Sequence, residues 1–236
     1  MIGKKVLIID DDVDVQKINE KVFRNIGAIV KVATNGTDGV RKFFLEKPDL
    51  VITDIMMPEM DGYETCSRIR QVSNVPIIML TALNSEEEII RGLESGADDF
   101  ISKPFSPDVL VARARALFRR LDMPRDSVVH GQYYSDGYLT IDLEKRIVLV
   151  EGDSIKLTRT EYNLLAYLLQ NAGWVRTFDQ ILVNVWGPEY QGSLDYVHVY
   201  ISNLRKKIEM DQRNPTYLES EHGVGYRFNK RVVSSS

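Results

Sequence analysis

The sequence predicts an α/β domain with a doubly wound, five-stranded parallel sheet, followed by a winged helix-turn-helix domain. In residues 1–120, five short apolar runs alternate with amphipathic stretches, which is the pattern of repeated βα units. After residue 137 the pattern changes to short strands with tight turns, then three helices and a terminal hairpin. The 236 residues are enough for two domains, each with its own core.

Five strands are expected in the first domain, each followed by a helix. They lie near residues 5–10, 29–33, 50–54, 77–81 and 99–102. Two helix starts are well marked, because Ser85 with Glu88 forms a capping box and Ser106 precedes a proline at the first helical position. We expect the last helix of this domain to extend to Arg120.

A linker is expected between the domains, because the apolar periodicity fades between Leu121 and about Gly137 while proline and glycine become frequent. The predicted domains are residues 1–121 and 136–232, and the linker covers 122–135. An ordered loop packed between the domains would have a similar composition, so both interpretations stay open.

The second domain combines short strands with three helices. The strands are expected near residues 138–141, 146–150 and 154–157, with a closing hairpin at 217–221 and 224–228. Two helices start at capping boxes, Thr158 with Glu161 and Thr177 with Gln180, and a third covers about 195–209. This order of elements is typical of a winged helix-turn-helix.

Composition limits the function. A net charge of −4 and a pI near 5.5 exclude a generally basic nucleic-acid binder, so any DNA contact depends on local placement of charge. No apolar run approaches the ~20 residues of a membrane span, and no signal peptide is visible, which predicts a cytoplasmic protein without membrane association. The single cysteine, Cys66, is interpreted as a packed core residue rather than a redox sensor.

Polar side chains stand where four of the predicted strands end. Asp10 and Asp11 follow the first strand, Asp54 ends the third, Thr81 ends the fourth and Lys103 follows the fifth. The carboxyl ends of parallel strands share one edge of a sheet, so these groups converge. Carboxylates can hold Mg²⁺ and offer a nucleophile, while the ammonium and hydroxyl bind phosphoryl oxygens. An acidic helix start or a simple turn could explain one motif alone, but all four together predict phosphorylation of Asp54.

These motifs closely resemble the receiver domain of two-component response regulators, a flavodoxin-like fold, over the whole of residues 1–120. The matching segments are Ile-Ile-Asp10-Asp11-Asp12, Asp54-Ile-Met-Met-Pro58 with Asp61-Gly62, Leu-Thr81-Ala82, and Asp98-Asp99-Phe100 followed by Lys103-Pro104. The resemblance implies that Asp54 accepts phosphate from a sensor histidine kinase. It also implies Mg²⁺ ligation by Asp11, Asp54 and the Met56 carbonyl, with Asp10 acting through water.

A switch is also implied by this resemblance. Thr81 and Phe100 would form the switch pair, in which the ring turns inward when Thr81 moves toward the phosphoryl group. The family often has tyrosine where this chain has Phe100, so the hydroxyl is missing from the switch ring.

The third helix of the second domain is the candidate DNA-reading element. On a helical wheel its core face carries Val197, Ile201, Leu204 and Ile208. The opposite face carries Asp195, Val199, Ser202 and Lys206, with Tyr196, His198, Asn203 and Arg205 at the flanks. An exposed Val199 would suit a thymine methyl group in the major groove. An ordinary solvated helix with a basic last turn fits the same pattern.

The second domain resembles the effector domain of the OmpR/PhoB family over about residues 138–229. The matching segments are Leu157-Thr158, Trp186-Gly187, Leu204-Arg205-Lys206-Lys207-Ile208 and Gly223-Val224-Gly225-Tyr226-Arg227-Phe228. The resemblance implies a recognition helix at 193–208, a wing toward the minor groove that includes His222 and Arg227, and a loop at 187–192 for RNA polymerase. The family often has arginine at the positions of Ser202, Asn203 and His222, so base preference differs here.

A homodimer formed on phosphorylation is implied as well. Its face would include Glu94, Asp98, Asp99, Arg113 and Arg115, which match charged positions of the family. Ile89 and Val109 stand where an arginine and a glutamate commonly pair, so the contact there is apolar or altered. Burial of both residues within the monomer is the alternative.

The leading interpretation is a phosphorylation-switched transcription regulator that binds double-stranded DNA and is not a turnover enzyme. A phosphatase of the haloacid-dehalogenase type would also use Asp10, Asp12, Thr81 and Lys103, but it leaves Asp54 without a role. A receiver joined to a protein-binding module is a third reading. It would bind its partner without the steep salt dependence of DNA binding.

Overall fold

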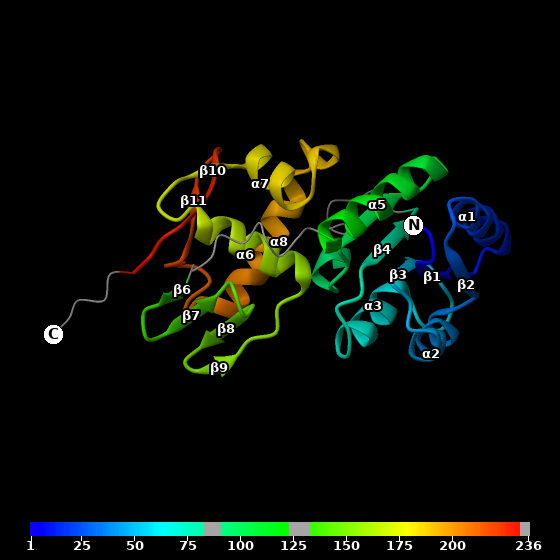
Figure 1. The fold of residues 1–236 in the computed structure, drawn as a ribbon, viewed down its shortest axis with the longest axis horizontal. Coiled ribbons are helices and arrows are strands. Elements are labelled where there is room, and N and C mark those ends of the chain that lie inside the picture. Colours follow the sequence, from blue (N-terminus) through cyan, green and yellow to red (C-terminus); the bar gives the residue numbers. More distant parts are fainter. Residues whose placement is uncertain (83–90, 123–132, 232–236) are drawn as a thin grey trace. The chain divides into compact units, whose positions relative to one another are not determined.

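The chain forms two compact units, residues Met1–Leu121 and Asp122–Ser236. The computed structural model describes residues 1–82, 91–122 and 133–231 (Figure 1). Ser85, Glu88 and Ile89, for which a capping box and a dimer contact are predicted, lie outside the described residues. No helix in the described part of the chain is long and apolar enough to cross a membrane.

The first unit is a five-stranded sheet in which every neighbouring pair of strands is parallel. The strand order is β2-β1-β3-β4-β5, with β1 at Lys5–Ile9, β2 at Ile29–Ala33, β3 at Leu50–Asp54, β4 at Ile77–Thr81 and β5 at Asp99–Ser102. The helices are α1 at Val13–Asn25, α2 at Gly36–Glu46, α3 at Gly62–Arg70 and α5 at Pro107–Asp122. The predicted strands and the doubly wound fold are confirmed.

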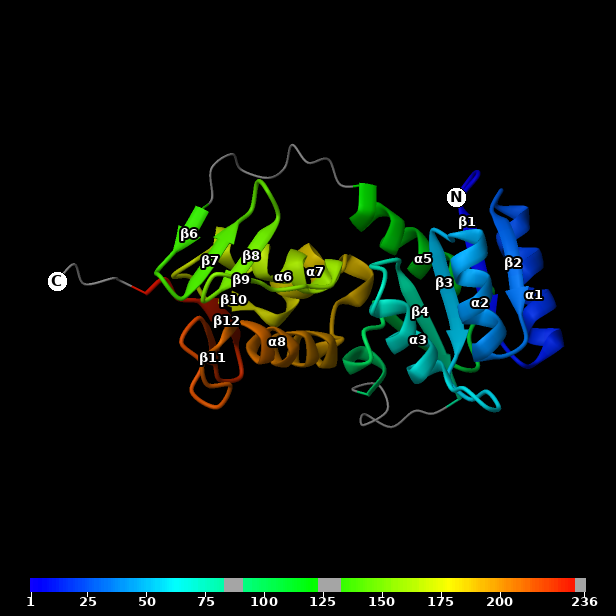
Figure 2. The same ribbon diagram turned by 90° about the horizontal axis from the view of Figure 1, so that it is seen from below.

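Two apolar layers cover the sheet because alternate side chains of each strand point to opposite faces. On one face, Leu7 and Ile9 pack with Phe43 of α2 and Cys66 of α3. The other face carries Val6 and Ile8 of β1, Phe23 of α1 and Leu117 of α5. Figure 2 shows the helices on the two sides of the sheet. Cys66 is fully buried, as predicted, and burial raises the pKa of its thiol to about 11.

Acidic and amide side chains start the first three helices. Asp12 accepts hydrogen bonds from Asp14 N and Val15 N at the start of α1, and Asn35 and Asp61 cap α2 and α3 in the same way. These caps fix where the loops after β1 and β3 end. The functional side chains of those loops are therefore held between a strand end and a capped helix.

The second unit contains two small antiparallel sheets around three helices. One sheet has the order β6-β7-β8-β9 and the other β10-β12-β11. The strands are β6 at Tyr133–Ser135, β7 at Leu139–Asp142, β8 at Ile147–Val150, β9 at Asp153–Ser154, β10 at Arg176–Thr177, β11 at Leu218–Glu221 and β12 at Gly225–Phe228. The helices are α6 at Arg159–Gln170, α7 at Phe178–Val185 and α8 at Leu194–Ile208, with a 3-10 turn η2 at Pro188–Tyr190.

Both capping boxes predicted for the second unit are present, at Thr158 with Glu161 and at Thr177 with Gln180. The linker boundary is wrong by three residues, because Tyr133–Ser135 pairs with β7 and belongs to the second unit's sheet. Its short length gave no periodic signal in the sequence. The two-residue strand β10 was missed for the same reason, although it pairs with β12 and completes the wing.

Candidate functional site

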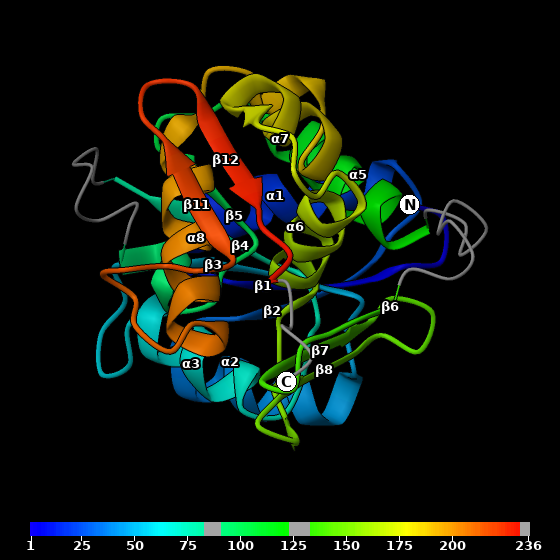
Figure 3. The same ribbon diagram turned by 90° about the vertical axis from the view of Figure 1, so that its left-hand side faces the viewer.

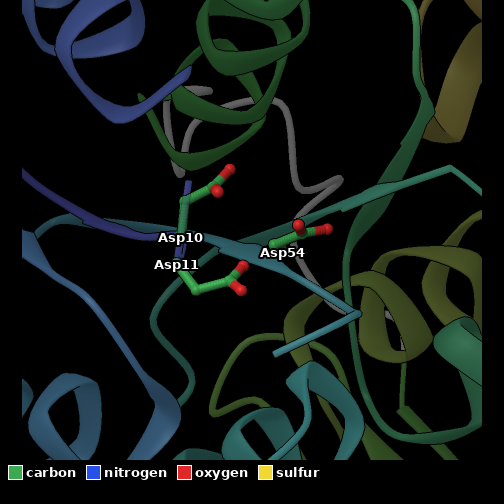
Figure 4. A group of neighbouring side chains, drawn as sticks. All are labelled: Asp10, Asp11 and Asp54. Carbon is green, nitrogen blue, oxygen red and sulfur yellow. The ribbon is translucent and has the colours of Figure 1, made fainter. Parts of the chain in front are cut away.

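Three carboxylates meet at the carboxyl edge of the receiver sheet. Asp10 and Asp11 follow β1, and Asp54 is the last residue of the adjacent strand β3. One ligand oxygen from each lies within 4.8 Å of the others (Figure 4). Between β1 and β3 the order of the strands reverses, which is where ligands bind in such sheets. The predicted convergence of these acids is observed.

Lys103, from the turn after β5, reaches into this cluster. Its Nζ lies 2.8 Å from Asp54 Oδ2 and 3.2 Å from Asp10 Oδ2. The second oxygen of Asp54 accepts a hydrogen bond from Ile55 N at 2.8 Å, and that of Asp10 accepts one from Asp12 N at 2.9 Å. The carboxylates of Asp10 and Asp54 are thus oriented by backbone donors on one side and the ammonium on the other.

Burial and the neighbouring charges shift the pKa values of Asp10 and Lys103 in opposing ways. Burial raises the pKa of Asp10; Lys103 acts against this and the neighbouring Asp54 adds to it, and the net result is a raised pKa. Burial alone would lower the pKa of Lys103, but the carboxylates of Asp54 and Asp10 outweigh it and raise the pKa. Lys103 is therefore charged at neutral pH, between two acids that repel each other.

The loop after Asp54 needs a glycine. A Cβ on Gly62 would lie 2.2 Å from the carbonyl oxygen of Asp54, so only glycine lets the start of α3 approach β3 this closely. Gly62 N donates to Ile55 O at 3.0 Å, which closes the loop. Met56 lies within this loop with its side chain 57% exposed.

The predicted switch residues flank the site. Thr81, at the end of β4, is fully buried, and it pairs in register with Ser102, next to Lys103. Phe100 is buried in the core layer that includes Met79 and Ala97, so its ring occupies an inward position in this structure. A Cβ on Gly92 would touch the Phe100 ring at 3.5 Å, so Gly92 packs directly against it.

The donor set fits Mg²⁺. All the candidate side-chain ligands are carboxylate oxygens, which hard divalent cations prefer, and one of them, Asp11, is exposed so that water can complete the coordination. The buried, mutually repelling pair of Asp10 and Asp54 supports the same assignment, because a dication would offset their charge.

The predicted dimer face is only partly a free surface. Glu94, Val109 and Arg115 are exposed, but Asp98 and Asp99 are buried. Asp98 pairs with Arg70 at 2.5 Å and accepts a hydrogen bond from Ile77 N at 3.0 Å, so its carboxylate ties α3 and β4 together within one copy. Its placement on a dimer surface is wrong. Val109 is 44% exposed, which contradicts the alternative that it is a monomer core residue.

Arg113 belongs to the same neighbourhood. Its Nη1 lies 3.9 Å from Asp99 Oδ1, and its side chain is 21% exposed. The Arg113 side chain therefore reaches the surface while its charge faces a buried acid.

The recognition helix differs from the helical-wheel prediction at two positions. Val199 is 5% exposed and Tyr196 is 6% exposed, so neither can contact a base. The reason is that α8 packs against both α6 and α7, which buries a wider arc than one stripe. Tyr196 makes edge contacts with the rings of Trp186 and Tyr190. The expected thymine contact through Val199 is wrong.

The exposed stripe of α8 consists of His198, Ser202 and Lys206, spaced four residues apart, with Asp195 and Asn203 partly exposed beside it. On the wing, His222 is exposed. Two predicted DNA contacts are bound to other groups of the same unit. Arg205 donates to Leu218 O and to Ser220 Oγ, and Arg227 pairs with Glu219 at 2.6 Å.

Sequence reasoning missed three residues at this surface. Phe178 and Tyr226, from α7 and β12, contact His198, and Ser220 of β11 accepts a hydrogen bond from Arg205. Figure 3 shows β11 and β12 of the wing beside α8. The motif around Tyr226 was visible in the sequence, but the partner of its hydroxyl depends on the strand register. Ser220 gave no signal of its own.

The fold and the site define a receiver domain joined to a winged-helix regulatory domain. The family model described as the response regulator receiver domain matches residues 6–115, and the one described as the C-terminal domain of transcriptional regulatory proteins matches residues 152–228. The chain belongs to the OmpR/PhoB family of two-component response regulators. It is thus a DNA-binding transcription regulator of a signalling system, in a family that is not made of turnover enzymes.

Similar proteins match over nearly the full length. The probable transcriptional regulator ycf27 of Cyanophora paradoxa is 42% identical over 95% of this chain and 96% of its own. The sensory transduction protein RegX3 of Mycobacterium bovis is 38% identical over 94% and 97%. A solved structure of a cysteine-to-serine mutant of RitR is similar with a TM-score of 0.79 at 25% identity, over 97% of this chain and all of that one.

Proposed function

We propose that this response regulator is phosphorylated on Asp54 by a sensor histidine kinase. The proposal rests on the position of Lys103 Nζ, which lies 2.8 Å from Asp54 and 3.2 Å from Asp10. These two residues and Asp11 form the carboxylate cluster at the carboxyl edge of the sheet. A lysine in this place binds the oxygens of a phosphoryl group bonded to Asp54. Thr81, at the end of the neighbouring strand, supplies a hydroxyl from the same edge.

In the transfer, a carboxylate oxygen of Asp54 forms a bond to phosphorus while the phosphorus–nitrogen bond of the donor phosphohistidine breaks. The electron pair returns to the imidazole of the donor, which then takes up a proton. Mg²⁺ held by Asp10, Asp11, Asp54 and the Met56 carbonyl would offset the negative charge of the carboxylates and the phosphoryl group. Ile55 N and Lys103 keep the Asp54 carboxylate oriented.

Intact-mass spectrometry after treatment with acetyl phosphate and Mg²⁺ tests the assignment. The wild type gains one phosphoryl group, and Asp54→Asn gains none. Asp12→Asn is the matched control, because asparagine caps a helix as well as aspartate and the Asp12 side chain caps α1. Full modification of the Asp54→Asn protein at another residue would contradict the proposal.

Phosphorylation then favours a homodimer through the surface with Glu94, Val109, Arg113 and Arg115, and the dimer binds two half-sites of promoter DNA. The acidic chain supplies little non-specific attraction to phosphates, so a second linked contact is needed for useful occupancy. The loop 187–192, which includes the turn η2, is the surface proposed to contact RNA polymerase.

The dimer is tested with DNA that the chain selects from a randomised duplex library. Arg113→Ala should lower the affinity of the phosphorylated protein for two half-sites by roughly tenfold and leave its affinity for one half-site unchanged. Arg68→Ala, which removes a surface pair with Glu64 on α3, is the control and should behave as wild type. Equal affinity of the phosphorylated wild type for both DNAs would mean that dimerisation is not the switch.

A further inference from the structure

A relay of four polar side chains, Arg205, Ser220, Tyr226 and His198, crosses the wing and ends on the exposed stripe of the recognition helix. Arg205 Nη2 donates to Ser220 Oγ at 2.9 Å. Ser220 stands directly opposite Tyr226 in the β11–β12 ladder, so the two hydroxyl-bearing side chains lie on the same face of the wing. The Tyr226 oxygen in turn lies 2.8 Å from Nδ1 of His198.

The Arg205 guanidinium at the start of this relay indicates which groups donate and which accept. A guanidinium has donors only, so Ser220 accepts from Arg205 and keeps its own proton for a neighbouring acceptor, and Tyr226 stands opposite it in the ladder. Burial raises the pKa of Tyr226, so its phenol keeps a proton to pass on. In this arrangement that proton points to His198 Nδ1, which accepts it. Neutral His198 then carries its proton on Nε2.

Packing holds the His198 ring in this orientation. Phe178 contacts it edge-on with a centroid distance of 5.1 Å, and the Tyr226 ring lies at 6.0 Å. The Arg205 guanidinium lies 5.6 Å from the centroid of the Tyr226 ring and also donates to Leu218 O. Three elements, α7, α8 and β12, therefore fix a side chain that is exposed to solvent.

We propose that His198 determines base specificity by presenting a fixed Nε2–H donor to the major groove, with Tyr226, Ser220 and Arg205 as positioning residues that select its tautomer. This inference rests on the proposed binding of promoter DNA by α8. It adds which group reads a base and what that base must offer.

The expected base is guanine. Guanine shows two acceptors in the major groove, N7 and O6, whereas cytosine shows a donor that would oppose Nε2–H. Adenine and thymine each pair one acceptor with a donor or a methyl group, so they rank between the two. The opposite tautomer, with an acceptor at Nε2, would reverse this order.

The test is selection of duplexes from a randomised library by the full chain, with and without acetyl phosphate. The wild type should select guanine over cytosine at one position of each half-site by roughly tenfold, in the range of a single mismatched base pair. His198→Ala should lose that preference and keep the others. Tyr226→Phe, which keeps the ring and removes the hydroxyl, should weaken the same preference severalfold.

Tyr217→Phe is the matched control. Tyr217 is another buried tyrosine of this unit, but its hydroxyl donates to Asp136 at 2.7 Å, outside the relay. Its removal should leave base preference unchanged. If His198→Ala retains the wild-type preference at every position, the specificity role is wrong while DNA binding stands. If Tyr226→Phe alone retains it, the positioning role of Tyr226 is wrong. If the wild type selects no sequence under either condition, the proposed function itself fails.

Nitrogen NMR of the full chain reads the tautomer independently of DNA. The chain has three histidines, and the His198→Ala spectrum identifies the signals of His198. In the wild type Nδ1 should be pyridine-like and Nε2 pyrrole-like, and Tyr226→Phe should show a mixture of tautomers. A pyridine-like Nε2 in the wild type would overturn the relay.

Discussion

The receiver site and the DNA-reading surface are built in different ways. In the receiver, the strand order brings the Asp10 and Asp54 backbones together, and the side chains need only extend from the strand ends. On the effector side, the orientation of the His198 ring on α8 depends on the hydroxyl of Tyr226, which comes from β12. The orientation of His198 therefore depends on a single oxygen atom, which Tyr226→Phe removes.

The two units also differ in how they treat buried charge. Burial and the adjacent Asp54 raise the pKa of Asp10, so the receiver keeps an acidic pair whose repulsion Lys103 only partly offsets. In the effector unit, Glu209 is buried, and its carboxylate accepts hydrogen bonds from three backbone N–H groups. A cation bound at the receiver site would therefore add stability, whereas the Glu209 carboxylate already accepts three backbone hydrogen bonds.

The largest loss of stability is expected on removal of the buried Glu209 carboxylate, which accepts several hydrogen bonds. Glu209 accepts from the backbone N–H groups of Thr216, Tyr217 and Leu218 at 2.7, 2.9 and 2.8 Å. Glu209→Ala leaves all three donors without this acceptor and should lower the free energy of unfolding of the effector unit by about 3 kcal/mol.

Urea unfolding followed by tryptophan fluorescence measures this directly, because Trp174 and Trp186 both lie in the effector unit. Glu221→Ala, at an exposed position at the end of β11, is the control and should change stability by less than about 0.5 kcal/mol. Equal midpoints for both variants would remove the contrast between the two units.

The same difference explains what the sequence could predict. The receiver strands, their order of appearance and the polar residues at their ends follow from apolar runs of four or five residues, which are local signals. Capping boxes are local as well, and both described ones, at Thr158 and Thr177, were found. Since a strand end fixes where its next side chain stands, the site of Asp10, Asp54 and Lys103 could be predicted without knowing any side-chain contact.

The recognition surface could not be predicted in this way. Burial of Val199 and Tyr196 depends on α8 packing against two helices at once, which a wheel with one apolar face does not represent. The hydrogen bonds of Arg205 depend on the position of β11, and the bond between Tyr226 and His198 depends on β12 lying beside α8. None of these is local in the sequence.

A smaller effect sharpens the other side of the comparison. An ion that binds the folded receiver and not the unfolded chain stabilises the fold, so about 10 mM Mg²⁺ is predicted to raise the stability of the receiver unit by about 1 kcal/mol. Asp11 is the exposed member of the carboxylate cluster, so Asp11→Asn should remove this increment and leave the stability in EDTA nearly unchanged. Asp14→Asn, at an exposed position in the first turn of α1, is the matched control and should keep the increment.

Thermal unfolding by circular dichroism with Mg²⁺ or EDTA gives the receiver transition, and tryptophan fluorescence gives the effector transition in the same samples. The effector midpoint should not respond to Mg²⁺. An increment of equal size in Asp11→Asn and wild type would show that the cation binds elsewhere, and the contrast between an unsatisfied receiver edge and a satisfied effector interior would not hold.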